Sequence, residues 1–269
     1  MKPNLILLAT FCTIIFLIPP ATAQSENSCV DCHKNPETVS TLPDWQQENF
    51  DEWEGSIHAS NDITCDKCHG GDPKLTKKEL SHEGVKDSSN PESSIYYKNI
   101  PKTCGNCHAD VYDEFKKSAM YHNLESDKLA PTCATCMGSH AITVVDMIKI
   151  SKKCSLCHNE MMGIRPEIPN EAERILLLQQ EVKSELLKAK SAVKQAKDRN
   201  KDVKRAEEAM QEATSRLEKS GSEWHRFRTI GFEREMLDAL YYSYKANNLA
   251  YESMAQTQSL KNKPSSTRK

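Results

Sequence analysis

Ten of the eleven cysteines in this chain stand in five pairs of a single spacing, Cys-x-x-Cys. In four of these pairs a histidine follows the second cysteine directly. Cys-x-x-Cys-His is the sequence to which c-type haem is covalently attached, because two thiols bind the porphyrin and the next imidazole reaches the iron. The pattern predicts covalent haem at five cysteine pairs: Cys29 and Cys32, Cys65 and Cys68, Cys104 and Cys107, Cys133 and Cys136, and Cys154 and Cys157.

Three other uses of paired cysteines explain the pattern less well. Zinc ribbons use such pairs but do not need a histidine immediately after the second cysteine. Disulfides suit an exported chain, yet a disulfide framework does not usually repeat one local spacing five times. Iron–sulfur ligation would leave the repeated histidine unexplained.

The fourth motif differs from the others, because Met137 replaces the histidine in the stretch CATCMGSH. Three interpretations are open. Met137 is the proximal ligand of a fourth haem, whose potential a thioether would raise relative to imidazole. Alternatively, the haem is attached while Met137 turns away and leaves an open or borrowed position. In the third case the motif carries no haem, so that the chain binds four haems instead of five.

The nine histidines divide into four that belong to the motifs and five that do not. One spare histidine follows each motif before the next motif or the chain end. Together with Met137 they make ten ligands, which is the number that five six-coordinate haems require. His82 lies in a polar stretch and is the weakest of these candidates. The predicted ligands are His33, His69, His108, His158, Met137, His58, His82, His122, His140 and His225, and the sequence does not assign spare histidines to particular haems.

The first residues predict export. Lys2, an apolar run and Ala21-Thr22-Ala23 are typical of a secretory signal cleaved after Ala23, over residues 1–23. An uncleaved anchor is the alternative, but the run is shorter than the roughly 20 residues of a spanning helix. No later segment is apolar enough to span a membrane, so we expect a periplasmic or otherwise exported protein. The formal charge of −2 gives no indication of nucleic-acid binding.

The remaining chain divides into two parts with different patterns. Residues 24–169 are predicted to form a loop-rich pentahaem domain with short helices, in which haems supply the apolar bulk. Residues 170–260 carry apolar side chains at steps of three and four, which predicts long helices. We expect two or three helices, interrupted near Arg199 and near Gly221, folded as a hairpin or small bundle packed on the haem domain. A coiled-coil arm that forms a homo-oligomer is the alternative. A disordered tail is expected over 261–269, and the fold class is mainly α.

Three stretches resemble a known superfamily. WEGSIHASNDITCDKCHGGD is similar to a W-x-x-S-x-H pattern followed by C-x-x-C-H-G, and CATCMGSHAI to C-x-x-C-H-G-x-H. EWHRF resembles the distal-histidine region of late helices. These are features of the multihaem c-type cytochromes that include cytochrome c nitrite reductase, hydroxylamine oxidoreductase and their small electron carriers. The resemblance implies that His58, His140 and His225 are distal ligands and that the haems stack in close pairs.

Three functions follow from this interpretation. The first is an electron carrier that relays single electrons between redox protein partners and makes or breaks no substrate bond, which the count of ten ligands favours. The second is a small nitrite- or hydroxylamine-type enzyme with the fourth haem as reaction centre, for which Met137 is the supporting feature. The third is a structural or assembly role for the helices. The resemblance is incomplete for the enzyme, because calcium-site and catalytic residues of nitrite reductases are not located in this chain.

Overall fold

In the computed structural model, residues 27–142 and 147–261 can be described, and all regular elements among them are helices. The predicted signal at 1–23 and the predicted tail beyond Lys261 lie outside these residues. The prediction of a mainly α-helical chain that ends in long helices is confirmed. The helices are α1 Ser28–Lys34, α2 Pro36–Val39, α3 Asp44–Glu54, η1 Ala59–Asn61, α4 Asp66–His69, α5 Lys78–Ser81, α6 Ile100–Gly105, α7 Ala109–Lys116, α8 Ala119–Glu125, α9 Cys133–Met137, α10 Met147–Cys154, α11 Ile168–Asp198, α12 Lys204–His225 and α13 Thr229–Lys261.

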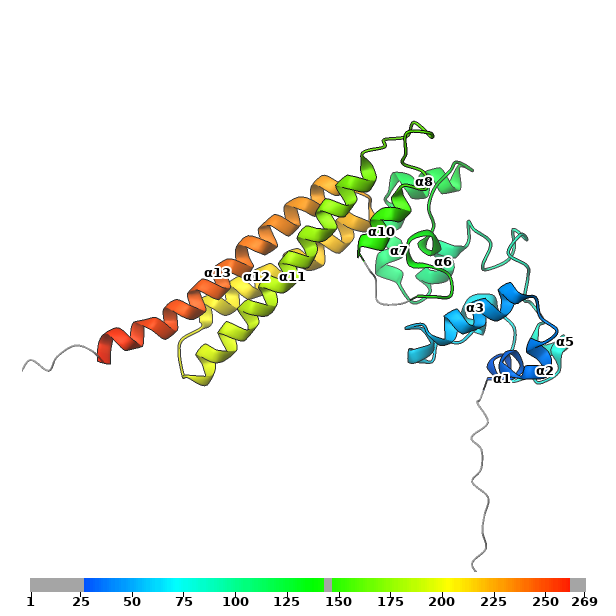
Figure 1. Cartoon of the computed structure of the whole chain (residues 1–269), viewed down its shortest axis with the longest axis horizontal. Helices are drawn as coiled ribbons and strands as arrows, with labels where there is room; N and C mark the ends of the chain where they lie inside the picture. Colours follow the sequence, from blue (N-terminus) through cyan, green and yellow to red (C-terminus); the bar gives the residue numbers. More distant parts are fainter. Residues whose placement is uncertain (1–26, 143–146, 262–269) are drawn as a thin grey trace, which may run out of the picture.

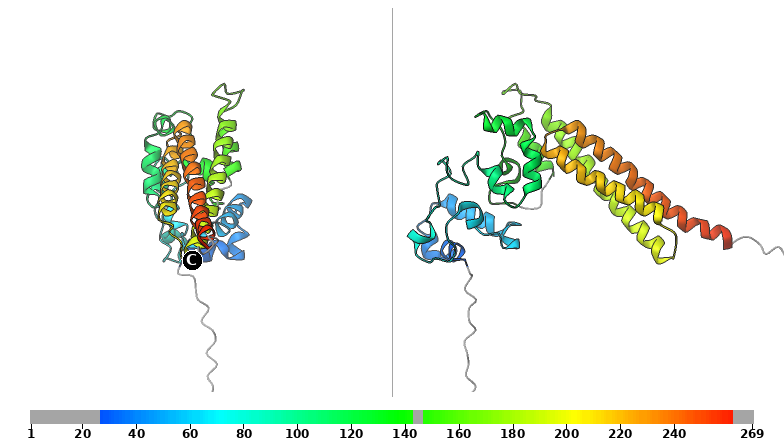
Figure 2. Two further views of the ribbon diagram at one scale, coloured as in Figure 1. Left: turned by 90° about the vertical axis from the view of Figure 1, so that its left-hand side faces the viewer. Right: turned by 180° about the vertical axis from the view of Figure 1, so that it is seen from behind.

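The molecule is elongated, with a three-helix bundle at one end and the short helices at the other (Figures 1 and 2). Helices α11, α12 and α13 lie side by side, and α12 runs antiparallel to the other two. The end of α13 lies at the tip of the bundle farthest from the short helices. Within the described residues, no helix is both long and apolar enough to cross a membrane.

The apolar stripe of the sequence forms the interior of this bundle. Ile175, Val182 and Met236 are fully buried in one cluster, which also contains Phe232. Further along, small alanines let the helices approach closely, and Ala196, Val203 and Ala250 meet near the α11–α12 turn. The stripe is therefore buried within the chain, and it does not form the face of a coiled-coil arm.

The predicted break near Gly221 is wrong. Helix α12 continues through Gly221 to His225, and the chain turns at Phe227, which has a left-handed backbone with φ of 57°. A glycine inside a helix costs only roughly 0.5–1 kcal/mol relative to alanine. Packing of α12 along α13 outweighs this cost, so tertiary contacts place the turn. The predicted break near Arg199 is confirmed, since α11 ends at Asp198.

The part of the chain before the bundle has little apolar interior of its own. Among the described residues before 170, Phe115, Leu124 and Ile150 are the hydrophobic side chains in the buried core, whereas the bundle supplies all the others. Burial of apolar area is the main favourable term in folding. The short helices therefore lack the protein core that would normally hold them together.

Contacts join the two parts of the molecule at the base of the bundle. Helix α10 packs along α11, with Ile150 in the same cluster as Ile175. At the end of α12, Arg226 pairs with Glu114 of α7. The Phe227 ring lies 6.2 Å from the Phe115 ring. The turn between α12 and α13 is thereby fixed on α7.

We expect the bundle core to be sensitive to truncation. Met236→Ala removes a fully buried side chain and should lower the free energy of unfolding by about 2–5 kcal/mol, because a cavity remains. The control Lys190→Ala changes an exposed residue of α11 and should stay within about 0.5 kcal/mol. Denaturant unfolding followed by helical circular dichroism measures both. Equal effects of the two substitutions would contradict the assigned core.

Candidate haem sites

Each of the five cysteine motifs is folded into one turn of helix. The first and fourth motifs lie inside α1 and α9. In the others, the backbone N–H of the residue after the second cysteine donates to the carbonyl of the first, as from His69 to Cys65 at 2.8 Å and from His158 to Cys154 at 2.8 Å. Residues three or four apart share a face of a helix. Each motif thus presents its two thiols and its fifth residue together.

The fourth motif keeps the backbone of a histidine motif although its fifth residue is Met137. In the second motif His69 is followed by Gly70, with φ of 82° and ψ of −159°. Met137 is followed by Gly138, with φ of 85° and ψ of 167°. Both glycines donate their N–H to the residue after the first cysteine. Met137 therefore occupies the backbone position that a proximal histidine has elsewhere, and its side chain is 39% exposed.

The ten motif cysteines form no disulfides with one another, and electrostatic contacts show which motifs lie close together. Burial, with Cys29 of the first motif as the next contribution, raises the pKa of Cys65 to about 11. Burial followed by Cys104 and Cys107 of the third motif raises the pKa of Cys68. Consecutive motifs are therefore neighbours from the first to the third.

The same order continues through the last two motifs. Cys104 and Cys133 are within hydrogen-bonding contact, which raises the pKa of Cys104 and lowers that of Cys133. Burial and the nearby Cys154 raise the pKa of Cys136 to about 11. Each motif thus has a thiol close to the next motif along the chain, and the third and fourth motifs contact each other directly through Cys104 and Cys133.

Three motif histidines each face the ring of a spare histidine, and the distance between ring centres is similar in the three pairs. The ring centres of His33 and His82 are 6.2 Å apart. Those of His58 and His108 are 6.3 Å apart, and those of His69 and His140 are 5.9 Å apart. Each pair contains one motif histidine and one spare histidine. The structure thereby brings together six of the predicted ligands, including His82.

This separation fits two axial ligands of one metal ion. A metal–imidazole bond of about 2.0 Å, with about 1.1 Å from nitrogen to ring centre, places two opposite rings roughly 6.2 Å apart. Aromatic rings without a metal also form pairs at about 4.5–7 Å. The feature that fits iron between the rings is that a motif histidine faces a spare histidine in all three pairs.

A glycine pair explains how His82 reaches the first motif. Gly71 has φ of 84°, and a Cβ atom there would lie 2.4 Å from the carbonyl oxygen of Ser81. The Asp72 N–H donates to the same Ser81 carbonyl at 3.0 Å. The Nδ1 atom of His82 lies 2.8 Å from the Lys78 carbonyl oxygen, which leaves the Nε2 atom of His82 available. The two glycines in CHGGD are the sequence feature that indicates a close approach of the segment before His82. The polar residues around His82 made it look like a weak ligand candidate.

The W-x-x-S-x-H stretch builds a compact turn around His58. The Trp53 indole N–H donates to the Ile63 carbonyl at 3.0 Å, and the Ile63 N–H donates to the His58 carbonyl at 3.0 Å. Ser56 is almost fully buried, and its hydroxyl accepts from the Ala59 N–H. These local bonds fix the backbone on both sides of His58.

His140 is tied to the same turn by one backbone bond, because the Ile57 N–H donates to the Ile142 carbonyl at 2.8 Å. The His140 Nδ1 atom is buried without a hydrogen-bond partner among the described residues. Burial lowers the pKa of both His69 and His140, and in His69 the facing His140 adds to the effect. Burial likewise lowers the pKa of His33 and His58. These imidazoles are thereby favoured in the neutral form that binds metal.

Among the described residues, none of the other three candidate histidines faces a second histidine ring, and the His122 ring lies 6.3 Å from the Tyr121 ring. His225 lines a cavity of ≈ 520 Å³ between α7 and α12, together with Val111 and Ser222. Its Nδ1 atom lies 2.6 Å from the Gly221 carbonyl, so that Nε2 is left for a ligand bond. His158 makes a similar contact with the Ile164 carbonyl at 2.9 Å. His122 lies exposed on α8.

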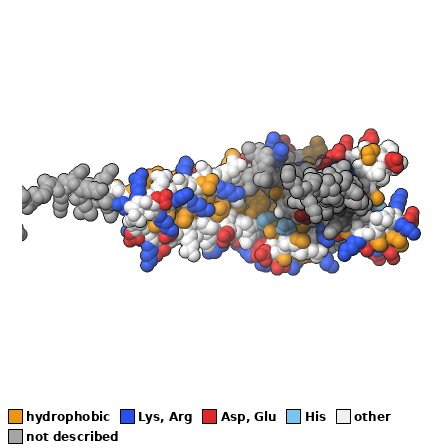
Figure 3. Space-filling model, turned by 90° about the horizontal axis from the view of Figure 1, so that it is seen from below, with side chains coloured by type: hydrophobic (Ala, Val, Ile, Leu, Met, Phe, Trp, Pro, Cys, Tyr) orange, Lys and Arg blue, Asp and Glu red, His pale blue; other side chains and the backbone are white. Residues whose placement is uncertain are grey.

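On the face shown in Figure 3, histidine side chains lie among hydrophobic side chains close to where the bundle begins. Among the described residues, no group of three or more His, Cys, Asp and Glu side chains could hold a metal ion as a cluster. The arrangement consists of paired rings and paired thiols, as a set of prosthetic groups would require.

Geometry and motifs together place this chain among candidates for multihaem proteins, and a comparison with known proteins agrees. The chain is 27% identical over 150 residues to the "Multiheme cytochrome MtrA" of Shewanella baltica (strain OS185), which covers 53% of this chain. The chain spans about a third of that relative, since the match covers 34% of its length. This similarity supports a relationship to a multihaem cytochrome. No family model matches the chain, and no solved structure matches it significantly.

Sequence reasoning did not identify the ion pair that holds His225 near α7. The Arg226 guanidinium, followed by Lys117, lowers the pKa of the Glu114 carboxyl below its usual 4.5. The Arg226 and Glu114 side chains are 26% and 19% exposed, whereas Lys117 is 54% exposed. The pair with Arg226 is therefore the less solvated of the two.

We expect Arg226→Gln to destabilise the haem-loaded protein more than Lys117→Gln. A carboxylate with a lowered pKa stabilises the fold above its unfolded pKa, and this contribution is lost as the pH falls through the folded pKa. The difference in stability between the wild type and Arg226→Gln should therefore be largest at pH 7. It should be lost as the pH falls below about 4.5 and Glu114 becomes protonated. Thermal unfolding at several pH values measures it. A difference that persists unchanged in acid would contradict the role of this pair.

Proposed function

We propose that this protein is a periplasmic multihaem c-type cytochrome that relays single electrons between redox partner proteins. Its cysteines would hold five c-type haems, and its histidines and Met137 would ligate their irons. One-electron oxidation and reduction of iron is the chemistry that haem supplies when bound. The observation that carries the proposal is the set of three histidine ring pairs, at 5.9, 6.2 and 6.3 Å.

These pairs support a specific ligand assignment. His33 and His82 would ligate the haem of the first motif, and His69 and His140 that of the second. His108 and His58 would ligate the third. His122 and His225 are then left as the distal candidates for the fourth and fifth motifs, whose proximal candidates are Met137 and His158.

The order of the motifs supports a relay. Neighbouring thiols link each motif to the next, from Cys29 and Cys65 at one end to Cys136 and Cys154 at the other. Cofactors attached to consecutive motifs would lie next to one another. The scarcity of buried apolar side chains before residue 170 agrees with prosthetic groups that fill this part of the molecule.

Met137 is the observation that favours a second candidate function, a small nitrite- or hydroxylamine-type enzyme with the fourth haem as its centre. The side chain is 39% exposed, and within the described part of the chain no histidine ring is paired at its motif. An iron with an open position would bind a small ligand. The retained backbone of the motif instead supports Met137 as a ligand and the carrier as the first candidate.

The mass of the intact mature protein should equal the polypeptide plus five haems. Met137→His should keep the mass increment of five haems over its own polypeptide and lower one midpoint potential, because imidazole replaces a thioether. Electrospray mass spectrometry and a spectroelectrochemical titration measure the two quantities. A wild type with four haems would show that Cys133 and Cys136 carry none, and unchanged potentials in Met137→His would mean that Met137 is no ligand.

The reduced protein should bind little or no carbon monoxide, because every iron has two protein ligands. His82→Ala should create one carbon monoxide site per molecule, since His33 would lose its facing ring. His82→Ala is matched by the control His122→Ala, which should create a site on a different haem with a different midpoint potential. Stoichiometric carbon monoxide binding by the wild type would instead support the enzyme, and an unchanged His82→Ala would refute the assignment of His82.

A further inference from the structure

One side of the bundle carries apolar side chains that its own core does not use. On α13, Leu237, Tyr241, Tyr244 and Tyr251 are 52%, 59%, 43% and 53% exposed. Their spacing of four, three and seven residues places them on one face of the helix. The row extends over roughly 21 Å at about 1.5 Å per residue. We call these four side chains the α13 stripe.

Helix α11 lies along α13 and has an exposed apolar side chain close to the start of the α13 stripe. This side chain is Leu177, which is 45% exposed. The Arg174 guanidinium donates to the Glu233 carboxylate at 2.6 and 2.8 Å, which holds α11 beside α13 near Leu177. Exposed apolar side chains that gather on one face are typical of an interaction site.

The charges at the two ends of the α13 stripe have opposite signs. Arg234 is exposed at the end nearest the α12–α13 turn, and Glu252 is exposed at the other end. Neither has an ion-pair partner within the described ranges 27–142 and 147–261. Lys245 lies between them, with its ammonium 5.9 Å from the Tyr241 ring centre. A partner helix that runs in the opposite direction would bring an acid to Arg234 and a base to Glu252.

We propose that the α13 stripe, with the adjoining side of α11, is the interface of an antiparallel homodimer. In this arrangement Arg234 of each copy lies opposite Glu252 of the partner, and each Tyr241 lies opposite Lys245 of the partner. A two-fold axis near Ser243 makes both contacts occur twice, as an isologous interface requires. A parallel pairing would set Arg234 against Arg234 and Glu252 against Glu252, which like charges oppose.

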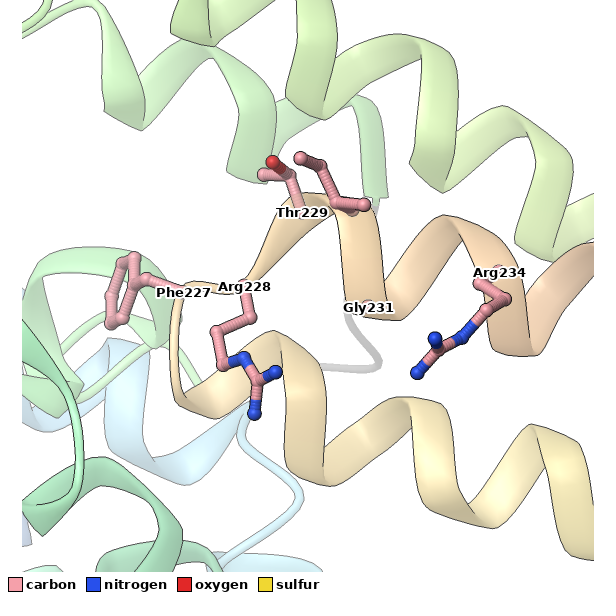
Figure 4. Close-up of a pocket in the computed structure, with 6 residues that line it drawn as sticks. Phe227, Arg228, Thr229, Gly231 and Arg234 are labelled. Atoms are coloured by element: carbon pink, nitrogen blue, oxygen red, sulfur yellow. The ribbon is translucent and has the colours of Figure 1, made fainter.

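A pocket lies at the base of the α13 stripe, where the distal end of the partner's helix would reach in this dimer. It has a volume of ≈ 400 Å³ and is lined by Phe227, Arg228, Ile230 and Arg234. Figure 4 shows that Phe227 is directed toward the short helices, with Arg228 and Arg234 along the turn and the first turns of α13. Arg228 pairs with Glu223 at 3.3 Å. Arg234 is thus the cation available to a carboxylate of the partner.

The distribution of charge over the whole molecule favours the same direction. Residues 27–169 contain 22 acidic and 15 basic residues, a net charge of −7. The α11–α12 turn at the tip of the bundle, residues 194–205, has six basic and two acidic residues, a net charge of +4. An antiparallel dimer brings each basic tip toward the acidic half of the other copy. Such complementarity sets the orientation of partners.

Size-exclusion chromatography with light scattering of the haem-loaded protein tests the proposal. We expect the mass of a dimer at micromolar concentration. Tyr241→Glu introduces a carboxylate at the centre of the α13 stripe and should weaken dimerisation by about tenfold or more. Unchanged Soret absorption and helical circular dichroism would verify that the variant is folded. A wild type that is a monomer at every concentration, or a Tyr241→Glu variant with unchanged affinity, would overturn the proposal.

Charge reversal tests the direction of the helices. Arg234→Glu and Glu252→Arg should each weaken the dimer by about tenfold, and the double variant should restore it. The matched controls Lys219→Glu and Glu208→Arg, at exposed positions of α12 outside the basic tip, should leave it unchanged. Single reversals without effect would overturn the antiparallel arrangement, because a parallel pairing keeps like charges opposed in every variant. Haem content is measured separately, so a monomer with five haems would refute only the dimer.

Discussion

The separation of paired imidazole rings is the constraint on which the assignment of the candidate haem sites depends. Three pairs have nearly equal spacing, although the partners are between 49 and 71 residues apart in the sequence. A metal ion between the rings would account for this spacing, because a bond on each side would fix the gap. The loops around His58, His82 and His140 have the conformations that deliver these rings.

The two parts of the molecule differ in what stabilises them. In the bundle, buried Ile175, Val182 and Met236 form a conventional apolar core. Before residue 170, buried hydrophobic side chains are few, so the polypeptide alone supplies little burial. The five one-turn helices instead hold ten thiols in series. Covalently attached cofactors would serve there both as core and as redox centres, which links the fold directly to the proposed function.

The helical bundle and the short helices meet at one junction. Arg226 and Phe227 contact Glu114 and Phe115 on α7. His225 immediately precedes this contact, and its position depends on it. The bundle thus brings a candidate iron ligand to the short helices, and its outer face carries the exposed α13 stripe. The helical bundle would therefore serve ligand placement and association through opposite parts.

The sequence by itself determined what depends on neighbouring residues. The Cys-x-x-Cys spacing predicted the motifs, and steps of three and four predicted the long helices and the break near Arg199, because both patterns are repeats of helical geometry. Only the tertiary structure decided which histidine faces which. His82 reaches His33 because Gly71 lets Ser81 approach, and α12 passes Gly221 because its contacts with α13 and α7 place the turn at Phe227. Such outcomes depend on packing between distant segments, which no local pattern records.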